Sequence, residues 1–121
     1  MIQFVIKTGQ LLADGVPIGQ GYAGHPPHVC DPLAIDVPKI GPLPPGLYDI
    51  GAPRDVPESV GAYAMPLTPD ARNVMFGRGG FYVHGDNSKG DQSASEGCIV
   101  TARAVREIIA RHSVLSVVTG T

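Results

Sequence analysis

The chain has no tryptophan, only two cysteines and no long hydrophobic run. Two cysteines, Cys30 and Cys98, are too few for a disulfide scaffold, although a single bridge between them remains open. No apolar stretch approaches the ~20 residues that a membrane-spanning helix needs. The segment Met1–Lys7 lacks the charged start, apolar stretch and cleavage site of a signal peptide. We therefore expect no membrane insertion, and synthesis in the cytoplasm without a signal peptide.

Charge of a single sign is also scarce. The formal net charge is −2, and lysine and arginine form no cluster, so nucleic acids and anionic membranes have no electrostatic attraction for the chain. Hydrophobic residues make up 43% and charged residues 17%, a balance typical of a folded globular protein. The length of 121 residues predicts one domain, residues 1–121.

Glycine and proline, by contrast, are abundant. Sixteen Gly and twelve Pro divide the chain into short segments, which favours strands and turns over helices. One helix is predicted over residues 101–112, because four apolar residues recur there at helical spacing and Thr101 is a suitable N-cap. Residues 24–45 and 53–61 are expected to be loops. Strands are predicted at 2–7, 10–13, 16–22, 47–51, 62–67, 74–76, 81–84 and 114–118, with 77–80 as a hairpin or bulged turn.

Two short segments contain the residues suited to catalysis. His84 ends a strand-like apolar run, and Cys98 follows the polar turn Ser95-Glu96-Gly97. A thiol becomes a strong nucleophile as the thiolate, and a nearby imidazole is the usual group that takes its proton. The pattern predicts Cys98 as nucleophile and His84 as general base, with a thiolate–imidazolium pair at neutral pH. The backbone N–H groups of Gly97 and Cys98 are the predicted oxyanion donors. Together they indicate a cysteine acyl-transfer site.

The group that orients His84 has three candidates. Asp86 lies two residues further on and would project to the same face if the strand continued. The Ser95 hydroxyl and a backbone carbonyl are the alternatives. A second cluster, His25, His28 and Cys30, matches no strong zinc-binding spacing, so we predict no metal and no cofactor.

In these residues the chain resembles the L,D-transpeptidase (YkuD-like) superfamily. Its hallmark is a histidine followed by a Ser-His-Gly-Cys turn, and residues 41–50 resemble its Pro-x-Gly-x-Tyr motif. Together with residues 19–24 and 75–78, the pattern is closest to the small L,D-transpeptidase-like toxins of type VI secretion systems. The resemblance covers residues 2–109. It implies a mainly β fold, a sandwich or barrel of short strands with one helix after the catalytic cysteine.

The resemblance also implies an activity. Such an enzyme attacks peptidoglycan tetrapeptide stems between the third residue, a diamino acid, and the terminal D-alanine. The thioester then passes to an amine, in transpeptidation or exchange, or to water, in L,D-carboxypeptidation. The chain would be an antibacterial effector that acts in the periplasm of a target bacterium after specialised secretion, and an immunity protein would plug its groove. The alternatives are a phage or housekeeping wall enzyme, and a non-catalytic wall-binding module of the same fold.

Two positions depart from the superfamily pattern. Glu96 stands where a second histidine is usual, and Val100 stands where an arginine is usual, two places after the cysteine. Another cation must then recognise the substrate carboxylate, with Arg78, Arg103, Lys89 and Arg106 as candidates. Tyr22 and Tyr82 either line the groove or belong to the core. The residues expected to bind substrate are Tyr22, Arg78, Tyr82, Gly85 and Arg103.

Overall fold

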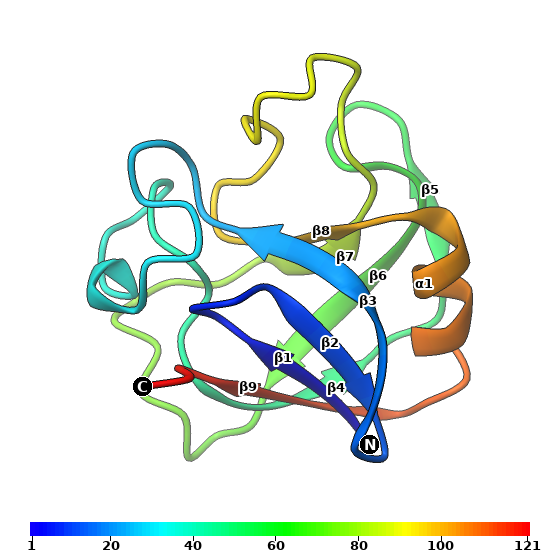
Figure 1. Ribbon diagram of the computed structural model, residues 1–121, viewed down its shortest axis with the longest axis horizontal. Coiled ribbons are helices and arrows are strands. Elements are labelled where there is room, and N and C mark those ends of the chain that lie inside the picture. The colour runs from blue at the N-terminus through cyan, green and yellow to red at the C-terminus, as the bar shows by residue number, and fades with distance from the viewer.

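The computed structural model describes residues 1–121 and is built mainly of short strands (Figure 1). The single α-helix is α1 (Arg103–Ile109), and a 3-10 turn, η1, spans Pro32–Ala34. No helix is long and apolar enough to cross a membrane. The strands are β1 (Ile2–Val5), β2 (Gln10–Ala13), β3 (Val16–Ala23), β4 (Gly46–Ile50), β5 (Arg54–Val56), β6 (Gly61–Pro69), β7 (Phe81–His84), β8 (Ile99–Thr101) and β9 (Val114–Val118).

The strands form one sheet that closes on itself. Their order is β4-β9-β1-β2-β3-β8-β7-β6-β5, and β4 also pairs with β6. That additional pairing completes a ring, a small barrel with β5 as an extra strand beside β6. The structure thus confirms the predicted mainly β class, a barrel of short strands with one helix.

The core fills the interior of this ring. Alternating residues of the first strand and the residue after it, Ile2, Phe4 and Ile6, are fully buried, as expected for a strand with one face inward. They belong to a cluster of fifteen buried hydrophobic residues drawn from most of the strands. The largest side chain in it, Tyr48, satisfies its hydroxyl by donating to the Pro44 carbonyl at 2.6 Å.

Helix α1 is shorter than predicted and starts differently. Thr101 belongs to β8, where its hydroxyl donates to the Gln20 carbonyl at 3.0 Å, and the N-cap is Ala102 without a side-chain cap. The helix is held instead by tertiary packing. Val105 presses against Gly19, where a Cβ would come within 2.5 Å of its methyl group, and the helix lies beside β3 and β6 (Figure 1).

Three further local predictions differ from the structure. Residues 74–76 are not a strand, so 77–80 is not a hairpin turn, because β7 pairs with β6 and β8 instead. The predicted loop 53–61 contains β5, which pairs with β6 across an irregular register. The strand β8 was not expected at all. Each of these elements depends on a long-range partner and not on a local sequence signal.

Candidate active site

The parallel pairing of β7 with β8 brings His84 and Cys98 to one place. The register aligns Val83 with Ile99 and His84 with Val100, so Cys98, just before β8, lies beside Tyr82. The Tyr82 N–H donates to the Cys98 Sγ at 3.3 Å. His84 and Cys98 both line a pocket of about 460 Å³ whose rim comes from four loops. The structure therefore places the predicted nucleophile and base in one cavity.

The His84 ring is oriented by a backbone carbonyl. Its Nδ1 lies 2.8 Å from the Gly85 oxygen, and because a carbonyl only accepts, Nδ1 carries the proton. The ring is 4% exposed. The other nitrogen, Nε2, makes no hydrogen bond and remains accessible from the pocket. The unprotonated Nε2 is thus the nitrogen available as a base.

Asp86 and Ser95 do not orient this ring. Asp86 Oδ1 accepts from the Tyr22 hydroxyl at 2.7 Å and from the Asn87 N–H. Ser95 is fully buried, and its Oγ fixes the turn before the nucleophile by donating to the Cys98 carbonyl at 2.6 Å. Of the three candidate orienters, the structure thus selects a carbonyl, that of Gly85.

Gly97 has a steric role that sequence reasoning did not assign to it. Its φ is +131°, and a Cβ would come within 2.7 Å of both Arg78 Nη2 and Phe81 Cε1, so only glycine fits without strain. Its N–H donates to Ser95 Oγ at 3.0 Å. The N–H of Cys98 donates to no other residue and contacts only its own sulfur. Of the two predicted oxyanion donors, therefore, only the Cys98 N–H is not bonded to another residue.

The electrostatics of the pair favour the neutral forms. Burial raises the pKa of the Cys98 thiol, with the Tyr82 N–H opposing that change. Burial likewise lowers the pKa of His84, while the bond to Gly85 opposes it. Burial therefore disfavours both charged forms, the thiolate and the imidazolium. The predicted thiolate–imidazolium pair is not the state that this geometry favours.

Arg78 lines the pocket but uses its donors on the protein itself. Its Nη1 donates to the carbonyls of Ile35 and Pro42 at 2.6 and 2.8 Å, and its Nη2 donates to that of Gly41 at 2.7 Å. The guanidinium also lies 5.2 Å from the Phe81 ring centre. Arg78 therefore holds the 35–42 loop against the nucleophile turn, and it is not the free cation that we expected to bind substrate.

The other expected substrate-binding residues divide between two places. Tyr82 lines the catalytic pocket, and its hydroxyl accepts from Arg54 at 2.8 Å. Tyr22 and Gly85 line a second pocket of about 450 Å³. Arg103 lines neither pocket and stacks on the Tyr63 ring at 4.0 Å.

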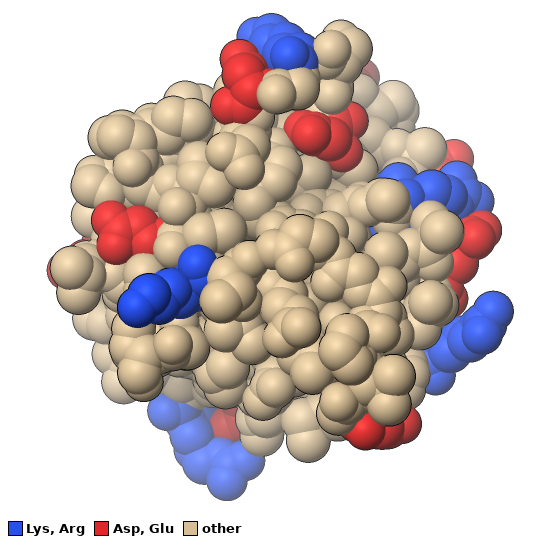
Figure 2. Space-filling view, in the orientation of Figure 1, with Lys and Arg blue, Asp and Glu red and all other residues tan.

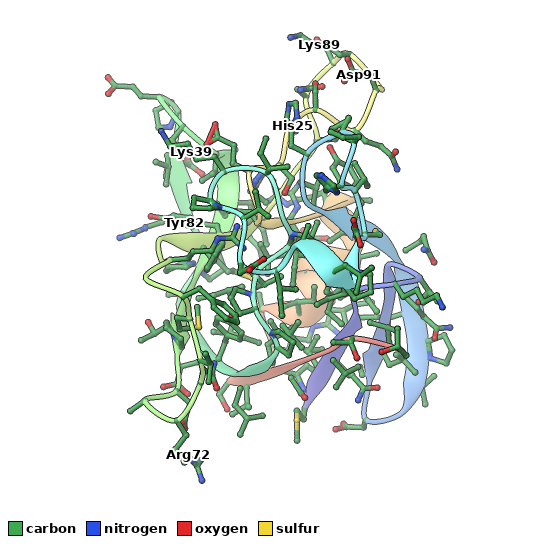
Figure 3. All side chains as sticks on the ribbon, turned by 90° about the vertical axis from the view of Figure 1, so that its left-hand side faces the viewer. His25, Lys39, Arg72, Tyr82, Lys89 and Asp91 are labelled. Carbon is green, nitrogen blue, oxygen red and sulfur yellow. The ribbon has the colours of Figure 1, made fainter.

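Lys39 is a pocket residue that sequence reasoning missed. It lines the catalytic pocket and forms no salt bridge. Figure 3 shows Lys39 above Tyr82 on the left of the view, with Arg72 far below them at the bottom. Its loop, residues 24–45, is tied to the nucleophile turn by the bond from the Leu43 N–H to the Gly97 carbonyl at 3.0 Å. The lysine reaches the pocket only because the Pro-rich loop folds in this way. No local sequence motif therefore predicts Lys39 as a pocket residue.

The remaining sequence cluster does not form a metal site. His28 Nδ1 pairs with Asp31 at 2.8 Å, and no group of three or more His, Cys, Asp or Glu side chains is close enough to hold a metal ion. Cys30 and Cys98 are both free thiols. On the face drawn in Figure 2, charged side chains lie mostly around the edge and form no large patch of one sign.

Comparison with protein families identifies the family of the chain. The Tlde1 domain model matches residues 18–119, and the chain belongs to this family. The family places it among type VI secretion effectors that target peptidoglycan. Among curated proteins, no significant match was found.

Proposed function

We propose that the protein is a cysteine-dependent L,D-transpeptidase or L,D-carboxypeptidase that acts on peptidoglycan tetrapeptide stems. One observation carries this proposal. Cys98 and His84 line a single pocket of about 460 Å³, while the Gly85 carbonyl holds Nδ1 and leaves Nε2 free. A thiol and an unprotonated imidazole nitrogen in one pocket are the two groups that such an attack requires.

The acylation step follows from the neutral resting pair. His84 Nε2 takes the thiol proton as Cys98 Sγ attacks the carbonyl carbon of the third stem residue. The N–H of Cys98 donates to the oxygen that becomes negative. The bond to the nitrogen of D-alanine then breaks, and Nε2 returns the proton to the departing amine. The product is a thioester between Cys98 and the shortened stem.

The second step decides between the two activities. Water or an amine attacks the thioester carbon while His84 Nε2 takes a proton from the attacking group. The bond from carbon to Sγ then breaks, and the proton passes to the sulfur. Water yields a tripeptide stem, whereas an amine yields a cross-link or an exchanged terminal residue. The pocket is open on the solvent side to either acceptor.

Lys39 is the group that we assign to the terminal carboxylate of the stem. It lines the catalytic pocket without an ion pair, whereas the donors of Arg78 are occupied by carbonyls. A compact ammonium on a flexible stem binds an exposed carboxylate as a point charge.

The proposal extends to where the enzyme works. Its substrate lies outside the inner membrane, so we place its action in the periplasm of a target bacterium after specialised secretion. An immunity protein that inserts into the catalytic pocket would protect the producing cell. A phage or housekeeping wall enzyme would perform the same chemistry without such a partner.

Mass spectrometry of purified disaccharide-tetrapeptide fragments tests the activity. We expect loss of D-alanine, or its exchange when another D-amino acid is supplied, and no product with Cys98→Ala. Cys30→Ala is the matched control, since it removes the other free, half-buried thiol, and it should retain turnover. Binding of the fragment without any product would favour the wall-binding module instead.

A further inference from the structure

A second pocket lies beside the catalytic one and is not used in the chemistry above. It measures about 450 Å³, and its lining includes Tyr22, Gly85, Asp86 and Arg106. Gly85 is the residue next to the base, so the two pockets lie on either side of the His84–Gly85 corner. The second pocket is polar and carries charges of both signs.

Its positive charge is a buried arginine with a free edge. Arg106 is 8% exposed, and its Nη1 donates to the Ala62 and Tyr63 carbonyls at 3.0 and 3.2 Å. The buried Nε has no partner, and Nη2 makes no hydrogen bond to the protein either. Nε and Nη2 form one side of the guanidinium, the fork that receives a carboxylate through two parallel hydrogen bonds. A buried donor without a partner calls for an explanation, and a ligand supplies one.

The neighbouring glycine lets the backbone pack closely against the guanidinium of Arg106. A Cβ at Gly85 would come within 2.9 Å of Arg106 Nη2. The same Cβ would lie 3.2 Å from both Cζ and Nη1, so a side chain at position 85 would displace the guanidinium. Glycine at this position therefore helps to fix where Arg106 lies in the second pocket.

Its negative charge is Asp86. Oδ1 accepts from the Tyr22 hydroxyl and the Asn87 N–H, which fixes the carboxylate. Oδ2 makes no hydrogen bond. A simple anion would be attracted by Arg106 and repelled by Asp86, and a simple amine would meet the reverse. A group that carries both charges close together satisfies both side chains.

We propose that the second pocket binds an α-amino-acid zwitterion, with its carboxylate on Arg106 and its ammonium on Asp86. This inference rests on the proposed function, which offers two sources of that chemistry. One is the end of a third-position diamino acid, such as diaminopimelate, whose side chain bears an amine and a carboxylate on one carbon. The other is the free amino acid that accepts the acyl group in exchange.

Direct binding to the Cys98→Ala protein tests the inference without turnover. Calorimetric titration would use diaminopimelate, D-alanine, D-alaninamide and N-acetyl-D-alanine as probes. We expect the zwitterions to bind and the two blocked forms of D-alanine to bind at least tenfold more weakly. Arg106→Gln and Asp86→Asn should each weaken zwitterion binding at least tenfold. Arg111→Gln removes an exposed arginine just beyond the same helix and should change nothing.

The outcomes distinguish the two sources of the zwitterion, the stem side chain and the free acceptor. They also distinguish failure of this inference from failure of the proposed function. Tighter binding of diaminopimelate than of D-alanine assigns the pocket to the stem side chain, and equal binding assigns it to the acceptor. If Arg106→Gln does not fold, Asp86→Asn and the blocked ligands still decide. Equal binding of blocked and free ligands, or no zwitterion binding at millimolar concentration, overturns the inference. Stem turnover without zwitterion binding refutes only this inference, whereas binding without turnover by the wild-type enzyme refutes only the proposed activity.

Discussion

Ser95→Ala is expected to lower the free energy of unfolding by about 3 kcal/mol, because one buried hydroxyl satisfies three backbone groups. Ser95 Oγ accepts from the Gly24 N–H at 2.9 Å and from the Gly97 N–H at 3.0 Å, and it donates to the Cys98 carbonyl at 2.6 Å. A buried polar group that loses its partner costs about 1–3 kcal/mol. We expect a loss near the lower end of the sum of these three costs, because the turn can relax and partly rebuild its hydrogen bonds.

Urea unfolding followed by circular dichroism measures this loss. Ser93→Ala is the matched control, because the Ser93 hydroxyl accepts one exposed hydrogen bond from Asn87 at 3.1 Å, and its effect should stay within about 0.5 kcal/mol. The acid limb of the Ser95→Ala pH–rate profile should keep its position, since the Gly85 carbonyl holds Nδ1. A loss below about 1 kcal/mol would refute the structural role. A displaced acid limb at unchanged stability would return Ser95 to the orienting role.

Five further predictions follow from the site and from the proposed function. A thiol-reactive probe should label Cys98 before Cys30, because the Cys98 thiol shares its pocket with the base His84; the labelling should be slow at pH 7, because burial raises the pKa of the Cys98 thiol, and preferential labelling of Cys30 would contradict the assignment. His84→Ala should lower kcat by about 10²–10⁴-fold without unfolding the domain, and near-normal turnover would require another base. For the wild type, the acid limb of kcat/KM should lie below pH 6.5, because burial lowers the pKa of His84 from 6.5 and activity is lost only as the imidazole gains its proton; a midpoint above pH 7 would be inconsistent with that. Lys39→Ala should raise KM for the stem and leave kcat nearly unchanged, and an unchanged KM would remove Lys39 from the site. Fusion to a periplasmic signal should make the chain toxic while the cytoplasmic form is tolerated, and toxicity that survives Cys98→Ala would defeat the wall-enzyme proposal.

The parts of the site that could be predicted are those written in consecutive residues. An apolar run that ends in His84 and a glycine directly before Cys98 are local signals, and the structure brings both residues to one pocket. The roles of the residues around this pair could not be predicted. Asp86 and Ser95 have the right chemistry to orient an imidazole, but their hydrogen bonds go to Tyr22 and to the nucleophile turn.

The same limit applies to the fold. Short strand-like segments between turn residues predicted β1 and β2 with correct or nearly correct bounds, because glycine and its neighbours mark the turns that end each strand. β5 and β8 have three residues each, which is too short for any period to show. Both exist because a neighbouring strand supplies their hydrogen bonds, so tertiary context decides them and not propensity.

The arginines show why the choice of a carboxylate-binding residue needed the structure. From the sequence, Arg78, Lys89, Arg103 and Arg106 were candidates for the cation that the superfamily resemblance implies near Val100, and only Arg78 and Arg103 were expected to bind substrate. The structure separates the three arginines by what their guanidinium groups already contact. Arg78 is occupied by three loop carbonyls and Arg103 by an aromatic ring, whereas Arg106 keeps one edge free.

The position of Arg106 offers a physical explanation for the valine at position 100. Val100 and Arg106 line the same pocket, and Val100 lies in register with His84 on the adjacent strand. A cation that β8 does not provide at position 100 is therefore delivered to the same cavity from helix α1. The Arg106 side chain extends from helix α1 toward the sheet. Its Nη1 bonds to the Ala62 and Tyr63 carbonyls hold the guanidinium in place. Val100→Arg in an Arg106→Gln background should therefore restore part of the zwitterion binding that Arg106→Gln removes. The single Arg106→Gln protein is the control. No recovery in a folded double variant would mean that the two positions do not serve the same ligand.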